Sequence, residues 1–217
     1  MAKGRDPNGV VLMYYGEKFN SISHLIGAVL ALIGLVLLIA LGVQKADPWK
    51  IVSFAIYGTT LLILYTISTL YHSLKGRAKV IFRKLDHLSI YLFIAGSYTP
   101  FALITLRGSW GWTILAIIWG LAFVGIALET IPNKGRRILS LITYLVMGWL
   151  ILVAVKPLSE QLPVYGLVLL VLGGVLYTTG VFFYVLDEKI RHFHGIWHLF
   201  VLAGSISHYF TMLFYLA

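Results

Sequence analysis

Two histidines near the end of the chain have the spacing of metal ligands. His194 and His198 lie four positions apart in an apolar stretch, so in a helix their imidazoles project from one face, one turn apart. A neutral imidazole binds Zn²⁺ at ~2.0–2.1 Å, which allows this pair to share one ion. A catalytic zinc site usually takes three protein ligands and leaves the fourth position to water. A third ligand must therefore come from another part of the chain.

The same spacing also fits histidines that lie at a helix end or pack among aromatic rings. Inside a membrane the metal interpretation gains weight, because ionisable side chains are costly there and tend to mark function. The composition indicates a membrane protein: 59% of the 217 residues are hydrophobic and 12% are charged, and the mean hydropathy is +0.90. The chain has no cysteine, which excludes disulfides and thiolate ligands.

Seven stretches are long enough to cross a bilayer, which takes about 20 mostly apolar residues. The sequence predicts an all-α fold, a polytopic bundle of seven transmembrane helices with spans at about 19–43, 51–73, 87–106, 112–131, 138–156, 163–186 and 195–216. The connecting segments, including 74–85 and 157–162, are predicted to be short loops. The first span is too long for a signal-peptide core and has no clear cleavage site, so we expect it to remain. Glycines within the spans, such as Gly27, Gly34, Gly173 and Gly174, are interpreted as helix-packing positions.

The basic residues predict the orientation of the bundle. Thirteen of the 17 Lys and Arg residues fall on the side of the N-terminus, and such an excess marks the cytoplasmic side. We therefore expect residues 1–18 to form a short cytoplasmic tail and residues 19–217 to form one transmembrane domain in the cell membrane, with the C-terminus outside. The basic residues lie in short connections between apolar runs, so nucleic-acid binding is not expected.

This topology brings several polar residues to one membrane depth. His72 ends the second span, Asp86 precedes the third, and His194 and His198 begin the seventh, all on the predicted cytoplasmic side. We predict a zinc site in which His72, His194 and His198 are the ligands. Asp86 would hold or deprotonate a water molecule on the metal, whose pKa zinc lowers towards ~7.

Three further residues have open roles. Ser68 lies one turn before His72, where its hydroxyl can bond to the site or polarise a substrate carbonyl, or can bond back to its own helix. Asp86 can alternatively be an N-terminal helix cap. His208 lies ten residues after His198, a helical rise of ~15 Å that is too large for a shared ion. We expect it to form a hydrogen bond between helices or a cavity contact.

The polar residues also form ordered motifs. They are Glu17-x-x-Asn20-Ser21-x-x-His24, Ser68-x-x-Tyr71-His72, Asp86-His87-x-x-Ile90-Tyr91 and His194-x-x-Trp197-His198, with His208 ten residues later. In order, spacing and membrane side, they resemble the bacterial hemolysin III branch of the progestin and adipoQ receptor family over all seven spans. The resemblance implies a seven-helix bundle with its N-terminus inside, zinc on the three matching histidines, and water near Ser68 and Asp86. Ser23 departs from the Thr that is more common before His24.

Two classes of function follow. The metal site of this family is similar to that of alkaline ceramidases, which implies a zinc-dependent hydrolase of a membrane lipid amide or ester. The alternative is a non-enzymatic protein with structural zinc: a lipid sensor, a regulator of membrane homeostasis or a hemolysin-like membrane-perturbing protein. A structural zinc is usually closed by four protein ligands, so three ligands beside a carboxylate favour the hydrolase. In both classes a membrane lipid is the expected partner.

Overall fold

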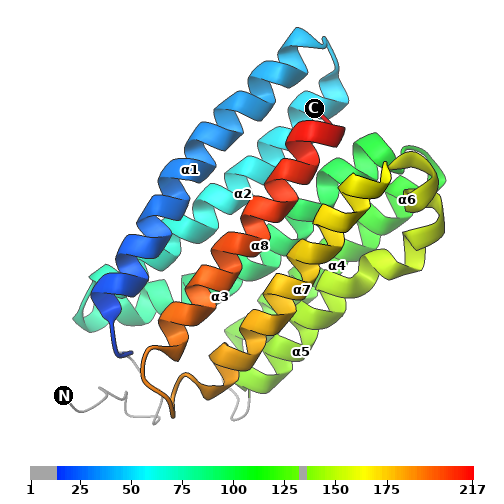
Figure 1. Cartoon of the computed structure of the whole chain (residues 1–217). Coiled ribbons are helices and arrows are strands. Elements are labelled where there is room, and N and C mark those ends of the chain that lie inside the picture. Colours follow the sequence, from blue (N-terminus) through cyan, green and yellow to red (C-terminus); the bar gives the residue numbers. More distant parts are fainter. Residues whose placement is uncertain (1–13, 132–135) are drawn as a thin grey trace.

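The computed structural model describes residues 14–131 and 136–217, which form a bundle of helices (Figure 1). The elements are α1 (Glu17–Gln44), α2 (Pro48–Ser73), α3 (Gly76–Pro100) with the π-helical turn η1 (Phe101–Thr105), α4 (Ser109–Thr130), α5 (Arg136–Trp149) with the 3₁₀ turn η2 (Leu150–Ala154), α6 (Val155–Gln161), α7 (Val164–Leu186) and α8 (Phe193–Tyr215). Across these residues, seven helical segments are long and apolar enough to span a membrane, and no strand occurs. The predicted seven-helix membrane fold is confirmed.

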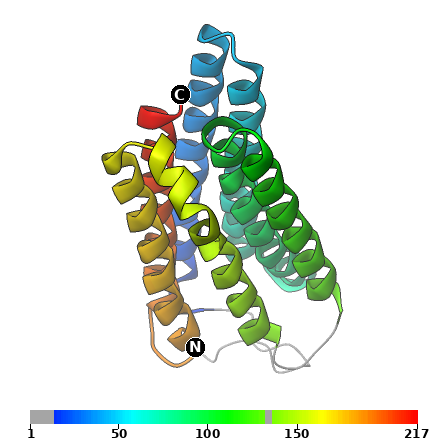
Figure 2. The same cartoon turned by 90° about the vertical axis from the view of Figure 1, so that its right-hand side faces the viewer.

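The packing order places the two ends of the chain side by side. α2 packs against both α1 and α3, while α8 packs against α7 and α1 (Figure 1). Figure 2 shows α5 between α4 and α7. Because α1, α2 and α8 are neighbours, polar residues from the first, second and last spans meet at one end of the bundle.

The third helix begins well before the predicted residue 87. α3 starts at Gly76, so the segment 74–85 is mostly helical and its prediction as a loop was wrong. Hydropathy undervalued the segment because it is rich in basic residues. One of them, Lys79, is buried and has partners on other helices: its Nζ donates to the Tyr71 carbonyl oxygen at 2.8 Å and lies 3.1 Å from Glu17 Oε1.

This longer helix changes the interpretation of Asp86. Its position is three turns inside α3, where the backbone N–H groups are already bonded within the helix. Asp86 is therefore not an N-terminal cap, and its carboxylate is free for a different role.

Two smaller differences concern the predicted ends of segments. The stretch 157–162 was predicted as a loop, but α6 extends to Gln161. Pro157 suggested a helix end, whereas it occupies the first turn of α6, where proline is tolerated. At the N-terminus α1 begins at Glu17, within the predicted tail of residues 1–18. The part of that tail before residue 14 lies outside the described residues.

Glycines allow the close packing of the helices, as predicted. A Cβ at Gly173 would lie 2.2 Å from Cδ2 of His208, and a Cβ at Gly27 would lie 2.8 Å from Cδ2 of Leu202. Both positions face α8, so α8 is held closely by α7 on one side and by α1 on the other.

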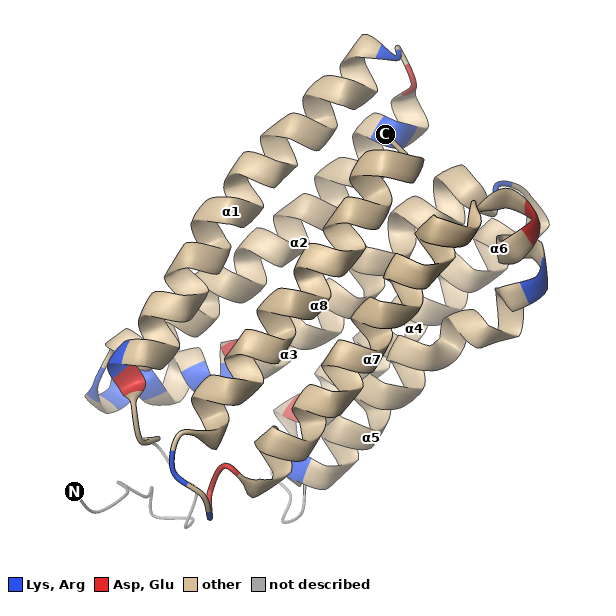
Figure 3. Cartoon of the chain, viewed as in Figure 1, with Lys and Arg blue, Asp and Glu red and all other residues tan. Residues whose placement is uncertain are grey.

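Charged residues gather at the ends of the bundle (Figure 3). Most of the described Lys and Arg residues lie at the end where α1, α3 and α8 begin, and few lie at the opposite end. This is the asymmetry from which the orientation was predicted.

Candidate metal centre and its cavity

Three buried histidines converge where α1, α2 and α8 meet. His72 lies in the last turn of α2, and His194 and His198 lie in the first two turns of α8. One ring nitrogen from each lies within 4.8 Å of the others, and the three residues are 2–5% exposed. The structure thus brings together the three residues that the sequence analysis selected as ligands.

Two of these rings face each other through their Nε2 atoms. His72 Nε2 lies 3.3 Å from His194 Nε2. On the opposite edges, His72 Nδ1 donates to Glu17 Oε2 at 2.5 Å and His194 Nδ1 donates to Asp187 Oδ2 at 2.7 Å. An ionised carboxylate only accepts, so each Nδ1 carries the hydrogen, and in the neutral form of these rings the two Nε2 lone pairs face each other.

This arrangement fits a metal ion. Two unprotonated nitrogens repel each other unless a cation lies between them. Ligands ~2.0–2.1 Å from a tetrahedral zinc ion lie roughly 3.3–3.4 Å apart, which is the separation of the two Nε2 atoms. The donor set, three neutral imidazoles with one edge held by a hydrogen bond, is typical of zinc sites.

The third histidine has a weaker partner. His198 Nδ1 lies 3.2 Å from the carbonyl oxygen of Asn20 and 3.4 Å from Ser23 Oγ. A carbonyl oxygen orients the ring as a carboxylate does but carries no full charge. Both partners belong to α1, so α1 supports the centre without supplying a ligand.

Each carboxylate behind the histidines pairs with a basic side chain, the buried Lys79 or the partly buried Arg137. Glu17 pairs with Lys79 and also accepts from the Tyr14 backbone N–H at 2.9 Å. Asp187 pairs with Arg137 of α5, whose Nη2 lies 2.5 Å from Asp187 Oδ1. Arg137 also bonds to the Glu188 carboxylate and to the Tyr184 carbonyl oxygen, and its guanidinium lies 4.2 Å from the centre of the Tyr184 ring.

Tyr14 covers the centre from the end of the bundle. Its ring stacks on His194 with 3.8 Å between ring centres and an interplanar angle of 10°. Burial raises the pKa of the Tyr14 phenol well above its ordinary value, so the phenol stays neutral. Next to it, the guanidinium of Arg191 lies 3.8 Å from the centre of the Tyr15 ring.

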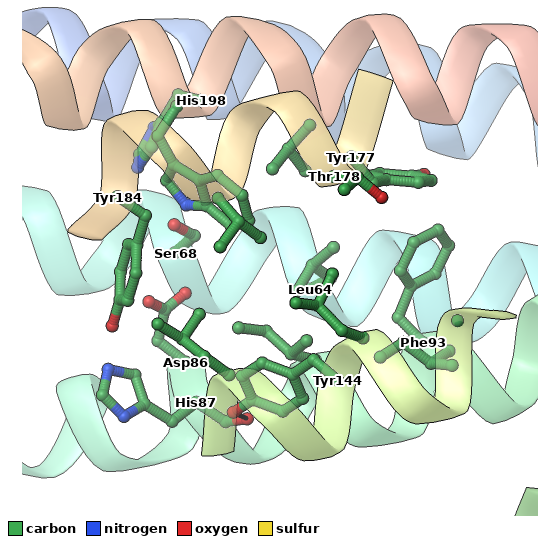
Figure 4. A pocket seen from close by; sticks show the side chains of 18 of the residues that line it. Leu64, Ser68, Asp86, His87, Phe93, Tyr144, Tyr177, Thr178, Tyr184 and His198 are labelled. Atoms are coloured by element: carbon green, nitrogen blue, oxygen red, sulfur yellow. Dashed lines mark hydrogen bonds between the residues drawn. The ribbon is translucent and has the colours of Figure 1, made fainter. Parts of the chain in front are cut away.

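A cavity extends from the histidines into the bundle (Figure 4). Together with the open space at its mouth it contains about 1200 Å³ not filled by protein atoms, and its wall is formed mostly by apolar side chains of α2, α3, α5, α7 and α8. His194 and His198 line one end and His208 lines the other. A second cavity shares His208, Trp149 and Gly174 with it, so the apolar space continues towards the opposite end of the bundle.

Asp86 and Ser68 lie at the histidine end of this cavity. The Ser68 hydroxyl of α2 faces the Asp86 carboxylate of α3, and His198 lies on the far side of the same space (Figure 4). Both residues are among those that the sequence analysis selected. The hydrogen bond of the Ser68 side chain is to Asp86.

His208 lies at the far end of the cavity, away from the three histidines. Its Nε2 donates to the carbonyl oxygen of Leu170 on α7 at 3.1 Å. The prediction that His208 forms a hydrogen bond between helices is confirmed.

The residues that support the three histidines were not predicted from the sequence. Asp187 was expected to lie in the connection before the last span and was given no role. Glu17 and Asn20 were named only as parts of the first motif. For the pair on α1 a signal existed, because positions 17, 20 and 24 recur at a spacing of three and four and so share one helix face. For Asp187 and Arg137, 50 residues apart, no local spacing indicated a pairing.

Comparison with known proteins agrees with this picture. Residues 13–209 match the family model described as haemolysin-III related. The chain is 47% identical to hemolysin-3 of Bacillus cereus over 200 residues, covering 92% of this chain and 91% of the relative. Its identity to the hemolysin-3 homolog of Bacillus subtilis (strain 168) is also 47%, over 92% of this chain and 93% of that protein.

The similarity extends to animal proteins. The chain is 30% identical to the human monocyte to macrophage differentiation factor over 208 residues, covering 93% of this chain and 85% of that protein. The family match thus includes every helix that carries the centre, from Tyr14 to His208. The chain belongs to the haemolysin-III-related family of membrane proteins, as its motifs led us to expect.

Proposed function

We propose that this protein is a zinc-dependent hydrolase that cleaves an amide or ester bond of a membrane lipid. One observation carries the proposal: three buried histidines that could hold a metal ion converge at the end of a largely apolar cavity that the carboxylate of Asp86 also lines. The three ligands leave one position of a tetrahedral ion for water or substrate, as in catalytic zinc sites. A purely structural site would usually use a fourth protein ligand.

His72, His194 and His198 would hold the ion. When bound, zinc supplies Lewis acidity and makes water a stronger acid at neutral pH. Glu17 and Asp187 keep two of the rings in the tautomer that binds metal, because each accepts the Nδ1 hydrogen.

Asp86 would act as the general base and then as the general acid. Its carboxylate takes a proton from the attacking water while the water oxygen forms a bond to the carbonyl carbon. The bond from carbon to the amine nitrogen or alcohol oxygen then breaks, and Asp86 returns the proton to the leaving atom. Ser68, which faces Asp86 across the cavity, is suited to orient the carboxylate or to donate to the carbonyl oxygen.

The shape of the cavity supports a lipid as substrate. His194 and His208 mark its two ends on α8, and their separation of 14 residues corresponds to ~21 Å of helix. That length is close to one leaflet of a bilayer including its headgroup region, about 20–22 Å. Gly148 of α5 and Thr178 of α7 line the cavity and are exposed on the lipid-facing side. A lipid would enter between these helices.

We further propose that the centre lies near the cytoplasmic face. Basic residues concentrate at the end of the bundle that carries the three histidines (Figure 3), and such residues favour the cytoplasm. A reporter fused after Ala217 should therefore read as external when tested in parallel with an N-terminal fusion. A cytoplasmic signal from Ala217 would reverse the topology and move the centre to the outer face.

Asp86→Asn separates the hydrolase from a lipid sensor with structural zinc. The substitution keeps the size of the side chain but removes the carboxylate that accepts the proton, so release of fatty acid from lipid amides by the purified protein should fall by roughly 10²–10⁴-fold. Zinc content should stay the same because Asp86 is not a ligand. Asp47→Asn is the matched control, since Asp47 caps α2 at the opposite end of the bundle.

If the protein is instead a lipid sensor with structural zinc, a different result is expected. The sensor requires that the parent protein bind lipid and one zinc ion per chain and yet release no fatty acid from a broad panel of membrane lipids. That result would end the hydrolase proposal.

A further inference from the structure

One polar residue of the inner face of α1 has no role in the metal centre. Glu17, Asn20 and His24 follow one another at a spacing of three and four residues and so share one face of the helix. Glu17 holds His72, and the Asn20 carbonyl holds His198. His24 makes no hydrogen bond to a ligand or to any other side chain that the structure describes.

His24 is buried with both ring nitrogens unused. The residue is 4% exposed, and neither Nδ1 nor Nε2 has a hydrogen-bond partner among the residues that the structure describes. The backbone of His198 approaches the ring without hydrogen-bond geometry. Buried polar atoms are nearly always paired, because an unmade hydrogen bond in the interior costs free energy. Water or a bound molecule is therefore the remaining source of hydrogen-bond partners for His24.

The ring of His24 is held in a fixed position on the cavity wall. It stacks on His198 with 3.6 Å between ring centres and an interplanar angle of 13°, and it meets Tyr65 edge-on at 5.0 Å. His24 lines the same cavity as Asp86 and Ser68. Tyr71 lines this cavity too, and its hydroxyl is buried without a partner among the described residues.

We infer that His24 recognises the polar head of the lipid in the cavity, and that this head carries a hydroxyl group close to the bond that is cleaved. A neutral imidazole offers one donor and one acceptor, and a hydroxyl group complements both. The position beside His198 places this contact next to the metal rather than along the apolar part of the cavity. The inference rests on the proposed function for the presence of a lipid, but it does not require that the lipid be hydrolysed.

Binding of two matched lipids tests this role. N-oleoylethanolamine and N-oleoylethylamine differ by one hydroxyl group beside the amide. The zinc-loaded protein in detergent should bind the ethanolamine about 3- to 10-fold more tightly, the usual worth of one hydrogen bond. His24→Phe keeps a flat ring for the stacking on His198 but removes both nitrogens, so it should bind the two lipids equally and retain its zinc.

Two further variants separate recognition from packing. His24→Gln keeps a donor and an acceptor and should preserve part of the preference for the hydroxyl. Tyr65→Phe removes a hydroxyl that bonds to Ser205 outside the cavity while keeping the ring next to His24. It should leave the preference unchanged.

Several outcomes would overturn the inference. An equal preference in His24→Phe and the parent protein would show that water, and not the lipid head, satisfies His24. Loss of zinc in His24→Phe would make His24 part of the metal centre, and failure of the parent protein to bind either lipid would exclude this class of ligand. Tight, hydroxyl-dependent binding without any release of oleate would contradict the hydrolase proposal but would support the role of His24 in recognition.

Discussion

The two ends of the cavity both contain histidine, but they use it in different ways. At one end, His72 and His194 donate from Nδ1 to carboxylates and turn their Nε2 atoms towards each other. At the other end, His208 donates from Nε2 to a backbone carbonyl oxygen. The comparison shows that the nitrogen used for the supporting hydrogen bond separates the two roles: His72, His194 and His198 use Nδ1, which leaves Nε2 for a metal, whereas the Nε2 of His208 is taken by Leu170.

The surroundings of the two ends differ in the same sense. At the histidine centre, Lys79 pairs with Glu17 and Arg137 pairs with Asp187, so each negative carboxylate is balanced by a positive side chain. Around His208 the contacts are uncharged: the Tyr177 ring meets its ring edge-on at 5.4 Å, and Gly173 leaves room for it. One end is therefore organised by electrostatics and the other by close packing.

The strongest test of this contrast removes the histidines one at a time. His72→Ala, His194→Ala and His198→Ala should each lose most of the bound zinc, because each deletes one of three ligands. Each should also lower the thermal stability of the zinc-loaded protein, since the ion links α2 to α8 and stabilises the folded state. His208→Ala is the matched control and should keep its zinc in a metal analysis of purified protein. Equal losses of zinc in the four variants would show that the two ends of the cavity do not differ in metal binding.

A smaller effect is expected from the groups behind the rings. Asp187→Asn and Glu17→Gln keep hydrogen-bonding atoms but remove the charge that fixes the tautomer, so zinc affinity measured by competition with a chelator should fall about 10–100-fold. Glu188→Gln is the control, because the Glu188 carboxylate bonds to Arg137 and holds none of the three histidines. If Glu188→Gln lowered the zinc affinity as much as Asp187→Asn does, the effect would come from the loop between α7 and α8 as a whole.

The smallest effect is expected at the packed end. Gly173→Ala places a Cβ 2.2 Å from the His208 ring, so the ring must shift and its bond to Leu170 is lost. We expect a destabilisation of about 1–3 kcal/mol, the usual cost of overpacking, without loss of zinc. Thermal unfolding with a parallel metal analysis measures both. Gly120→Ala is the control, because a Cβ there meets no atom within 4 Å.

Much of the fold was predictable because lipid imposes simple rules. Each span has to be about 20 apolar residues long, and the described helices satisfy this. The start of α3 was not predictable from hydropathy, because Lys79 is buried only through partners on α1 and α2. A basic residue that forms a tertiary contact is indistinguishable from a loop residue in a single sequence.

The ligands of the centre were easier to predict than its supports. The spacing of four residues between His194 and His198 predicts that they share one helix face. The topology places His72 at the same membrane depth, which makes it the third ligand. Asp187 and Arg137 have no such signal: their pairing depends on α5 and α7 lying side by side, which a pattern of apolar runs does not encode. The first motif gave a partial signal in the shared face of Glu17, Asn20 and His24.

The stacking of Tyr14 on His194 has a consequence for the rate at which metal is exchanged. The flat contact of 3.8 Å between the two rings leaves no space for a chelator on that face of His194. The ring of the adjoining Tyr15 contacts the Arg191 guanidinium and the His192 ring, both in the connection that precedes α8. Removal of the ion from the aqueous side requires these aromatic contacts to separate first. Zinc should therefore leave slowly even where it is bound only moderately tightly, so the lifetime of the loaded protein is set by this short segment as well as by the ligands.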